Sequence, residues 1–336
     1  MINQLKSQIK VLVLFAAMIL PVSTFAQSLI PGFGTARSGT DGFQFTKISV
    51  DPRGASMGNS RTADAFDASS LYWNPALASK LESSEIMFGH TEYFAGITME
   101  YAAYVHRIKS FAFGASIQFL NSGEINETTE FNPLGTGRTF RTTHLSAGIT
   151  ASQAITDFFS YGVTIRYLLE KIEDVDIETA AFDFGFFYRI PETPFRFSVN
   201  INNFGFDATP SGSTTRQTLD GVVTETDFEE VTTPTRFIVA SAVDVIKRND
   251  LSLVLTAQLT NPSDNSERFS FGGELGYMDQ FFLRTGYESG RDEIKLPSAG
   301  AGIKFPITGT TIAADYGFSP FERLGNVHRV GIRIIL

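Results

Sequence analysis

The sequence of 336 residues predicts an all-β protein: a transmembrane antiparallel β-barrel of about 14 strands, with an N-terminal hatch, or plug, that contains short helices. Three observations carry this prediction. Apolar and polar residues alternate with a period of two from about residue 97 onward, which is typical of strands whose two faces meet different environments. The mean hydropathy is near zero, as expected when lipid-facing and lumen-facing residues cancel in an average. No run of eighteen apolar residues follows the N-terminal segment, which excludes helical membrane spans.

The last eight residues show the alternation most clearly. One face of this terminal strand is apolar and consists of Val330, Ile332, Ile334 and Leu336. The other face carries Arg329, Gly331 and Arg333. We expect this strand to close the barrel by pairing with the first one, Glu85–Thr91, and to place its apolar end on the periplasmic rim.

Composition narrows the class further. Aromatic residues make up 13% of the chain, with 32 Phe, and there are 29 Gly, a mixture that suits strands with an apolar outer face and a crowded inner one. Cysteine is absent, so the chain has no disulfide framework and no thiol or cysteine-metal site. The formal charge of −9 and the lack of a Lys/Arg cluster argue against nucleic acid as a partner.

Residues 1–26 are predicted to be a signal peptide. Lys6 and Lys10 give a positive n-region, Val11–Leu20 is an apolar h-region, and Thr24-Phe25-Ala26 offers small residues at the −3 and −1 positions. The apolar stretch is too short for the alternative, an uncleaved anchor helix. No Cys follows the expected cleavage site, which excludes a lipoprotein.

Residues 27–84 are predicted to form the hatch. This segment is rich in Gly, Ala, Ser and Asp and does not alternate cleanly. We expect short helices near Ala55–Phe66 and after Asn74-Pro75. Asn74 is suited to the N-cap position and Pro75 to the first helical position.

Residues 85–336 are predicted to form the barrel. Its fourteen candidate strands are Glu85–Thr91, Ile97–His106, Ser110–Leu120, Thr143–Ser152, Phe158–Glu170, Thr179–Tyr188, Phe195–Asn203, Arg236–Ile246, Leu251–Leu259, Arg268–Tyr277, Gln280–Glu288, Ser298–Phe305, Thr311–Phe318 and Val327–Leu336. An even number returns both termini of a single-chain bacterial barrel to the same side.

The connections between these strands also fit a membrane barrel. They are short after even-numbered strands and mostly longer after odd-numbered ones, which is the asymmetry of an outer-membrane barrel rather than of a soluble sandwich. The first connection, Glu92–Gly96, is the exception because it is short. The Thr-rich part of the largest loop, Thr209–Thr233, is predicted to be mobile and solvated.

No catalytic, metal or cofactor site is predicted. The four His (His90, His106, His144 and His328) do not share metal-ligand spacing, so each is interpreted as a rim or lumen residue. His144 and Ser146 match the His-x-Ser pair of outer-membrane phospholipases, but the strand pattern points both into the lumen, away from lipid. The chain is therefore predicted not to be an enzyme.

Many charged residues of both signs occupy the predicted inward face. Because an unpaired buried ion costs several kcal/mol, mixed signs in such number indicate an ion-pair network inside a plugged lumen. A selectivity ring would instead carry charges of one sign. The predicted inward charges are Glu100, Arg166, Glu170, Asp183, Arg196, Arg236, Asp244, Arg268, Glu274, Arg284, Glu288, Lys304, Asp315 and Arg333.

Two stretches of the hatch carry a family resemblance. Asp51–Gly58 reads DPRGASMG, and Asp64–Ala76 reads DAFDASSLYWNPA. This pattern resembles the hatch segment of the PorV/PorQ family of Bacteroidetes outer-membrane proteins and, more distantly, of FadL-type fatty acid transporters. The resemblance implies a fourteen-stranded barrel with a hatch in its lumen, in the outer membrane of a Gram-negative bacterium.

The hatch motif supplies the candidate site, either structural or ligand-gating. Asp67 and Asn74 can cap short helices, Trp73 is an apolar anchor with one donor, and Gly54 and Gly58 allow close approach to the barrel wall. We favour packing of the plug over contact with a ligand. The candidate residues are Arg53, Gly54, Met57, Gly58, Asp67, Trp73, Asn74 and Pro75.

Two functions follow from the resemblance. PorV-like members act in type IX secretion, which implies secretion-system proteins or secreted substrates as partners. FadL-like members pass hydrophobic molecules, such as long-chain fatty acids, through an opening in the wall. Both place outer-membrane lipid around the barrel. A continuous apolar cavity in the lumen favours transport, whereas a packed, charged lumen favours secretion or surface-protein handling.

Overall fold

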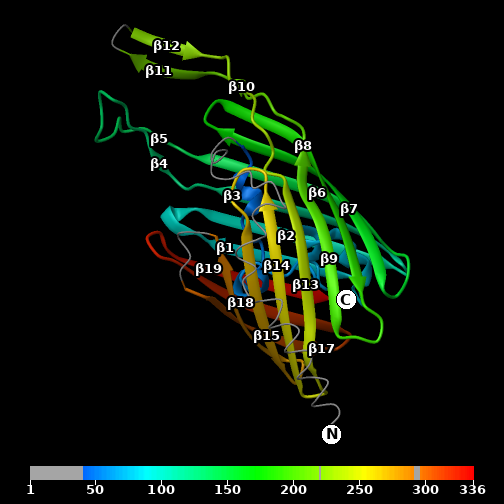
Figure 1. Ribbon diagram of the computed structural model, residues 1–336. Helices are drawn as coiled ribbons and strands as arrows, with labels where there is room; N and C mark the ends of the chain where they lie inside the picture. Colours follow the sequence, from blue (N-terminus) through cyan, green and yellow to red (C-terminus); the bar gives the residue numbers. More distant parts are fainter. Residues whose placement is uncertain (1–40, 219–220, 291–295) are drawn as a thin grey trace, which may run out of the picture.

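The structure, a computed structural model, describes residues 41–218, 221–290 and 296–336. The predicted signal peptide and the first part of the predicted hatch lie outside the described residues. The chain forms a closed antiparallel barrel of fourteen strands, and hatch segments from residue 41 to 84 lie inside the ring (Figure 1). No helix in the described ranges is long and apolar enough to cross a membrane.

All fourteen predicted barrel strands are present, and their ends differ from the predicted ones by four residues or fewer. The barrel strands are β1 (Glu85–Glu92), β2 (Thr98–Ile108), β3 (Phe111–Asn121), β6 (Thr142–Ala154), β7 (Phe159–Ile172), β8 (Val175–Arg189), β9 (Phe195–Gly205), β13 (Arg236–Lys247), β14 (Leu251–Pro262), β15 (Arg268–Tyr277), β16 (Phe281–Ser289), β17 (Ser298–Ile307), β18 (Thr310–Phe321) and β19 (Gly325–Ile335). The period-two pattern therefore located the wall correctly.

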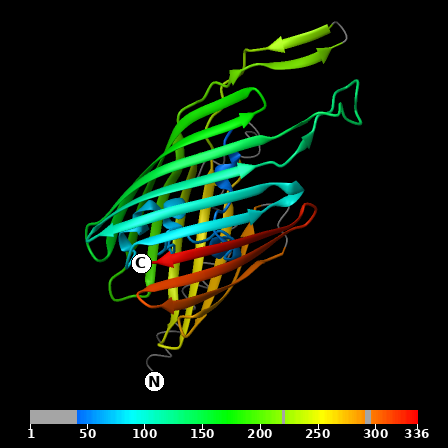
Figure 2. The same cartoon turned by 180° about the vertical axis from the view of Figure 1, so that it is seen from behind.

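The terminal strand closes the ring as predicted. β1 pairs antiparallel with β19, from Glu85 opposite Ile335 to Glu92 opposite His328. The two strands lie side by side in cyan and red when the barrel is seen from behind (Figure 2). The ladder continues around the barrel to β8 and β9, which pair with a register shift between Phe182 and Phe184.

The two faces of each strand differ as the alternation predicted. On β3, Phe113 and Ile117 are exposed on the outside, whereas Ala112 and Gln118 are buried inside. One predicted inward charge is wrong. Glu100 of β2 points outward, because its neighbours Met99 and Tyr101 take the buried positions on this strand.

The hatch consists of short helical segments joined by turns. They are η3 (Gln44–Lys47), α2 (Pro52–Ser56), α3 (Ser70–Trp73) and η4 (Pro75–Lys80). The helix predicted at Ala55–Phe66 is displaced: α2 ends at Ser56, because Gly58 and Asn59 adopt positive φ angles that stop a right-handed helix. The cap predicted at Asn74 is confirmed, since its side-chain oxygen accepts from the Ala76 amide at 3.0 Å.

Two hairpins extend beyond the barrel at the rim with the long loops (Figures 1 and 2). One contains β4 (Ile125–Asn126) and β5 (Thr139–Phe140), and the other contains β11 (Thr214–Thr218) and β12 (Gly221–Glu225). The region predicted to be a mobile, solvated loop thus holds a hairpin, and β10 (Ser211–Gly212) also pairs with β8. The short first loop contains η5 (Phe94–Gly96).

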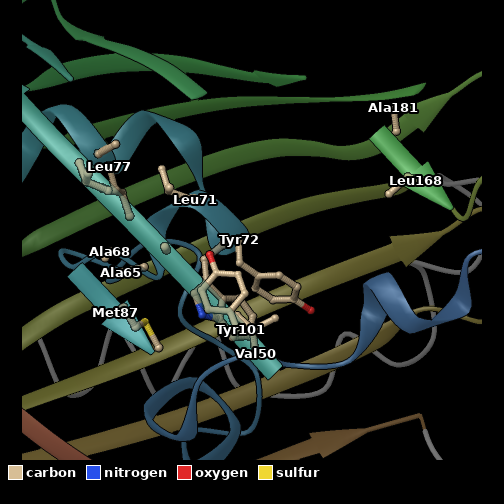
Figure 3. Close-up of a cluster of buried hydrophobic side chains, with 14 of the residues drawn as sticks. Val50, Ala65, Ala68, Leu71, Tyr72, Leu77, Met87, Tyr101, Leu168 and Ala181 are labelled. Carbon is tan, nitrogen blue, oxygen red and sulfur yellow. The ribbon is translucent and has the colours of Figure 1, made fainter. Parts of the chain in front are cut away.

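The main apolar core lies between the hatch and the wall. Hatch residues Val50, Leu71 and Tyr72 pack toward the wall residues Met87 and Tyr101 (Figure 3). The lumen is therefore occupied by protein at this level, and the hatch is held partly by ordinary hydrophobic burial.

Candidate functional site

A chain of ion pairs connects the hatch to the wall. Asp51 caps α2 by accepting from the Gly54 amide at 2.9 Å, and this start orients Arg53 toward β15. The Arg53 guanidinium donates two hydrogen bonds of 2.6 Å to the carboxylate of Glu274. A bidentate pair of this kind fixes both distance and angle.

The chain continues through the wall itself. Glu274 also accepts from Arg284 of β16, whose guanidinium donates to Asp315 of β18 at 2.6 Å. Arg333 of β19 in turn donates to Asp315 at 3.2 Å and to Asp67 of the hatch at 3.3 Å. The network of lumen charges predicted from the sequence is confirmed for these wall residues.

Asp67 lies at the centre of a cluster of arginines. Its carboxylate accepts from Arg61 at 2.8 Å and from Arg53 and Arg333 at 3.3 Å each. Burial alone would raise the pKa of Asp67, but the positive charges of Arg61, Arg333 and Arg53 outweigh it and hold this pKa well below its usual range. Asp67 also accepts from the Ser69 amide, so it supports the turn that leads into α3.

The hatch is expected to resist mild acid and to loosen only in strong acid. Because the folded pKa of Asp67 is depressed, its contribution to stability is present above its unfolded pKa of about 4 and is lost as the pH falls through the lower folded value. Protease protection of the hatch, measured against pH, should stay flat from neutral pH to about 5 and then fall. Asp67→Asn should weaken protection already at neutral pH and flatten the acid limb. An unchanged acid limb in this variant would contradict the assignment.

A second arginine ties the centre of the hatch together. Arg61 is completely buried and donates to Asp51 at 2.8 Å and to Asp67 at 2.8 Å. Asp64 accepts from Arg196 of β9, which also donates to Asp244 of β13 at 2.7 Å. Asp51, Arg61 and Asp64 were not selected from the sequence. The only sequence feature that could have pointed to these three residues is that they are charged residues in a segment composed mostly of small ones.

Trp73 joins separate segments of the hatch to each other. Its indole N–H donates to Asp51 at 2.7 Å, and its ring stands edge-on to Tyr72 at 4.9 Å. A Cβ added at Gly54 would lie 2.3 Å from this ring. Gly54 therefore makes room for Trp73 within the hatch.

The segment Asn74-Pro75 lies directly against the wall. Its neighbours on β7 and β8 are Gly162 and Gly185, where an added Cβ would come within 2.4 Å of Pro75 and 2.2 Å of Asn74 respectively. The Asn74 amide also donates to Ser198 of β9 at 2.9 Å. Because these two wall residues are glycines, the hatch backbone packs directly against the wall, where a larger wall side chain would clash.

Met57 and Gly58 make a similar contact on the opposite part of the wall. Gly58 has a φ of 62°, and a Cβ there would lie 2.5 Å from the backbone nitrogen of Tyr287. Met57 is fully buried, with its backbone against Gly286 of β16. The expected close approach of Gly58 to the wall is therefore present.

One large cavity opens at the rim with the long loops. It has a volume of about 560 Å³ and ends on the hatch. Its lining includes charged, polar and aromatic side chains, among them Phe45, Lys47, Tyr93, His144, Glu170, Arg268, Glu288, Phe321 and Arg329. Lys47 at the floor donates to Asp264 at 2.6 Å, so the charges there are engaged with each other.

His144 and Ser146 face the lumen, as predicted, but they do not form a nucleophile–base pair. His144 is hydrogen-bonded to Glu170 at 3.1 Å and to Thr142 at 3.2 Å. The Ser146 hydroxyl is buried and has no hydrogen-bond partner among the described residues. A catalytic Ser requires a base within hydrogen-bond reach.

Known structures with the same architecture include hydrocarbon channels. The toluene transporter TbuX of Ralstonia pickettii superposes with a TM-score of 0.58 at 13% identity, covering 84% of this chain and 96% of that one. The toluene transporter TodX of Pseudomonas putida gives 0.58 at 11%, covering 84% and 96%. The CymD monoaromatic hydrocarbon channel gives 0.58 at 12%, covering 85% and 96%. At these identities the likeness shows a shared fold alone.

Sequence comparison identifies the family. No curated protein matches the chain. A family model described as "Type IX secretion system protein PorV" matches residues 34–261, which span the described hatch and the wall from β1 to most of β14. Neither this family nor the hydrocarbon channels are enzyme families. The chain belongs to the PorV family of type IX secretion system proteins.

Proposed function

We propose that the protein is a barrel of the Gram-negative outer membrane that acts in type IX secretion or surface-protein handling by binding other proteins, with its own lumen kept closed. Secretion-system proteins or secreted substrates are the proposed partners. Residues 1–26 are proposed as the signal peptide, residues 27–84 as the hatch and residues 85–336 as the barrel. Family membership supports the secretion context.

The proposal that the lumen is closed rests on the contacts between the hatch and the wall. Buried ion pairs link Arg53 to Glu274, Arg333 to Asp67 and Arg196 to Asp64. These pairs fix the position and orientation of the hatch against the wall, and the apolar core that hatch and wall share must also be exposed if the hatch is to leave the lumen. The cavity above it is lined by charged as well as aromatic groups, which suits a protein segment better than a hydrocarbon.

A deletion strain tests the role. Without this protein, secreted proteins should accumulate in the periplasm or fail to attach at the surface, and a plasmid copy should restore both. Fractionation and surface labelling measure the outcome. Normal export and normal surface attachment in the deletion strain would contradict the proposal.

A second candidate function is transport of hydrophobic molecules, such as long-chain fatty acids. Its support is the shared fold with the toluene and monoaromatic hydrocarbon channels. Proteoliposomes that contain the purified protein would distinguish the two. Uptake of a radiolabelled fatty acid or toluene above that of empty liposomes would favour transport, and uptake equal to the empty control would favour the secretion role.

A further inference from the structure

A second, much smaller cavity lies between the hatch and the inner face of β9 and β13 to β16. Its volume is about 30 Å³, which holds about two water-sized groups. Four residues line both this cavity and the large one at the rim, namely Lys47, Asn59, Arg268 and Glu288. The small cavity therefore adjoins the large one, which gives it a route to the solvent.

Arg236 of β13 enters the small cavity from the wall. Within the residues that the structure describes, no carboxylate pairs with its guanidinium, and nothing accepts from its buried Nε–H. The guanidinium stands 5.8 Å from the centre of the Tyr72 ring, which is a cation–π contact with the hatch. Such a contact leaves the N–H groups available, and a buried cation without a hydrogen-bonded counter-ion is unfavourable.

Positive charge is in excess around this cavity, since three basic side chains and one acidic side chain line it. Lys47 is bonded to Asp264 at 2.6 Å, and Arg268 lies 3.6 Å from Glu288. Burial lowers the pKa of Lys47, and Asp264 opposes this effect. The positive charges of Arg268 and Arg236 lower the pKa of Lys47 further, so these cations are close enough to repel one another. Because both carboxylates already have basic partners, the charge of Arg236 is the one left uncompensated.

Hydroxyl groups add neutral donors around the same space. Thr260 of β14 lines the cavity, and its oxygen accepts from Gln258 at 3.1 Å, so its own proton is left for another acceptor. Ser270 of β15 also lines the cavity and is buried. A buried site that combines a guanidinium with hydroxyl donors suits an anion, because hydrogen bonds to a charged group are stronger than those between neutral groups.

We propose that the small cavity beside Arg236 is a binding site for a chloride ion. The ion lies against the Arg236 guanidinium, accepts from the hydroxyls of Thr260 and Ser270, and compensates the excess positive charge. A volume of about 30 Å³ suits a monatomic anion, whereas a phosphate or a carboxylate on a chain needs more room. The ion thereby joins the wall at Arg236 to the hatch around Trp73. This site goes beyond the proposed secretion role and does not depend on it.

The single tryptophan of the chain reports on this site. Trp73 lines the cavity and is 4% exposed, so halides in the bulk solvent reach its ring poorly. Sodium bromide is titrated into the purified protein, because bromide quenches indole fluorescence on contact. Sodium gluconate, whose anion is too large for the cavity, holds the ionic strength constant. We expect quenching that saturates and that added chloride reverses. Quenching that rises linearly without saturation, or no quenching, would overturn the proposal.

Removal of the guanidinium provides the second arm. In Arg236→Gln, the bromide concentration at half-saturation should rise at least about tenfold, because a charge-assisted hydrogen bond is lost. Arg138→Gln removes an exposed arginine and should leave the half-saturation unchanged. Heat-modifiable migration confirms that each barrel is folded. Equal half-saturation in Arg236→Gln and the unmodified protein would overturn the assignment to Arg236.

Two further measurements define the ion and remove the dependence on a variant. Displacement of bromide by sulfate or acetate, but not by chloride, would overturn the assignment of a halide. Anomalous diffraction from bromide-soaked crystals of the unmodified protein should show a peak beside the Arg236 guanidinium. A cavity without such a peak would overturn the site even if Arg236→Gln does not fold.

Discussion

Replacing Arg61 with Met is expected to free the hatch from a barrel that remains intact. Arg61 is fully buried and neutralises both Asp51 and Asp67, so the variant leaves two carboxylates in a place that water does not reach. Breaking a buried pair in this way costs about 3–5 kcal/mol. The barrel ladder contains none of these three residues and should keep its own stability.

Two measurements can detect the release of the hatch in Arg61→Met. Hydrogen exchange of amides in residues 51–80 should become faster, with an opening free energy lower by about 3 kcal/mol. Planar-bilayer recordings should show ion conductance that the unmodified protein lacks. Arg138→Met is the control, because Arg138 is 72% exposed and surface ion pairs contribute about 0–1 kcal/mol. Unchanged exchange in Arg61→Met would contradict the role assigned to this arginine.

Gly286→Ala is expected to push the hatch away from the wall by adding a single methyl group. A Cβ at Gly286 would lie 2.1 Å from the carbonyl carbon of Met57 and 2.3 Å from the nitrogen of Gly58. Both are backbone atoms, which cannot rotate aside as the end of a side chain can. Overpacking typically costs about 1–3 kcal/mol and occasionally more, and this contact involves two rigid segments.

The neighbouring strand offers a matched control for this change. Gly273 of β15 faces outward, where an added Cβ would meet a Leu255 methyl group at 3.3 Å. Gly273→Ala should therefore leave hatch exchange and conductance unchanged, while Gly286→Ala should increase both. Equal behaviour of the two variants would show that the close packing of Met57-Gly58 against the wall does not hold the hatch.

The wall was predictable from the sequence because its signal is local. A half-buried strand shows a period of two within ten residues, and Arg268–Tyr277 was placed to the residue. The hairpins β4–β5 and β11–β12 were missed because they bury little apolar surface and so lack that alternation. The C-terminal end of α2 was missed because a positive φ at Gly58, where the chain meets Tyr287, stops the helix.

The candidate site was predictable only in part for a related reason. Trp73 and Asn74 were selected from the sequence because their residue types are unusual in a short segment of small residues. Arg61 was not selected, since its importance depends on meeting Asp51 and Asp67 in the folded hatch. Likewise, the outward position of Glu100 depends on which neighbours the hatch buries, which is information from distant parts of the chain.

Locking the hatch in place tests whether the protein works with its lumen closed. Ser60 of the hatch and Thr256 of β14 have hydroxyl oxygens 2.6 Å apart, and the native chain has no cysteine, so Ser60→Cys/Thr256→Cys creates a single disulfide. Secretion and surface attachment are measured in the deletion strain that carries this variant, before and after reduction. We expect the oxidised protein to restore both secretion and surface attachment as well as the unmodified protein does. Failure of the oxidised protein, with recovery on reduction, would show that the hatch must move and would contradict a function with a closed lumen.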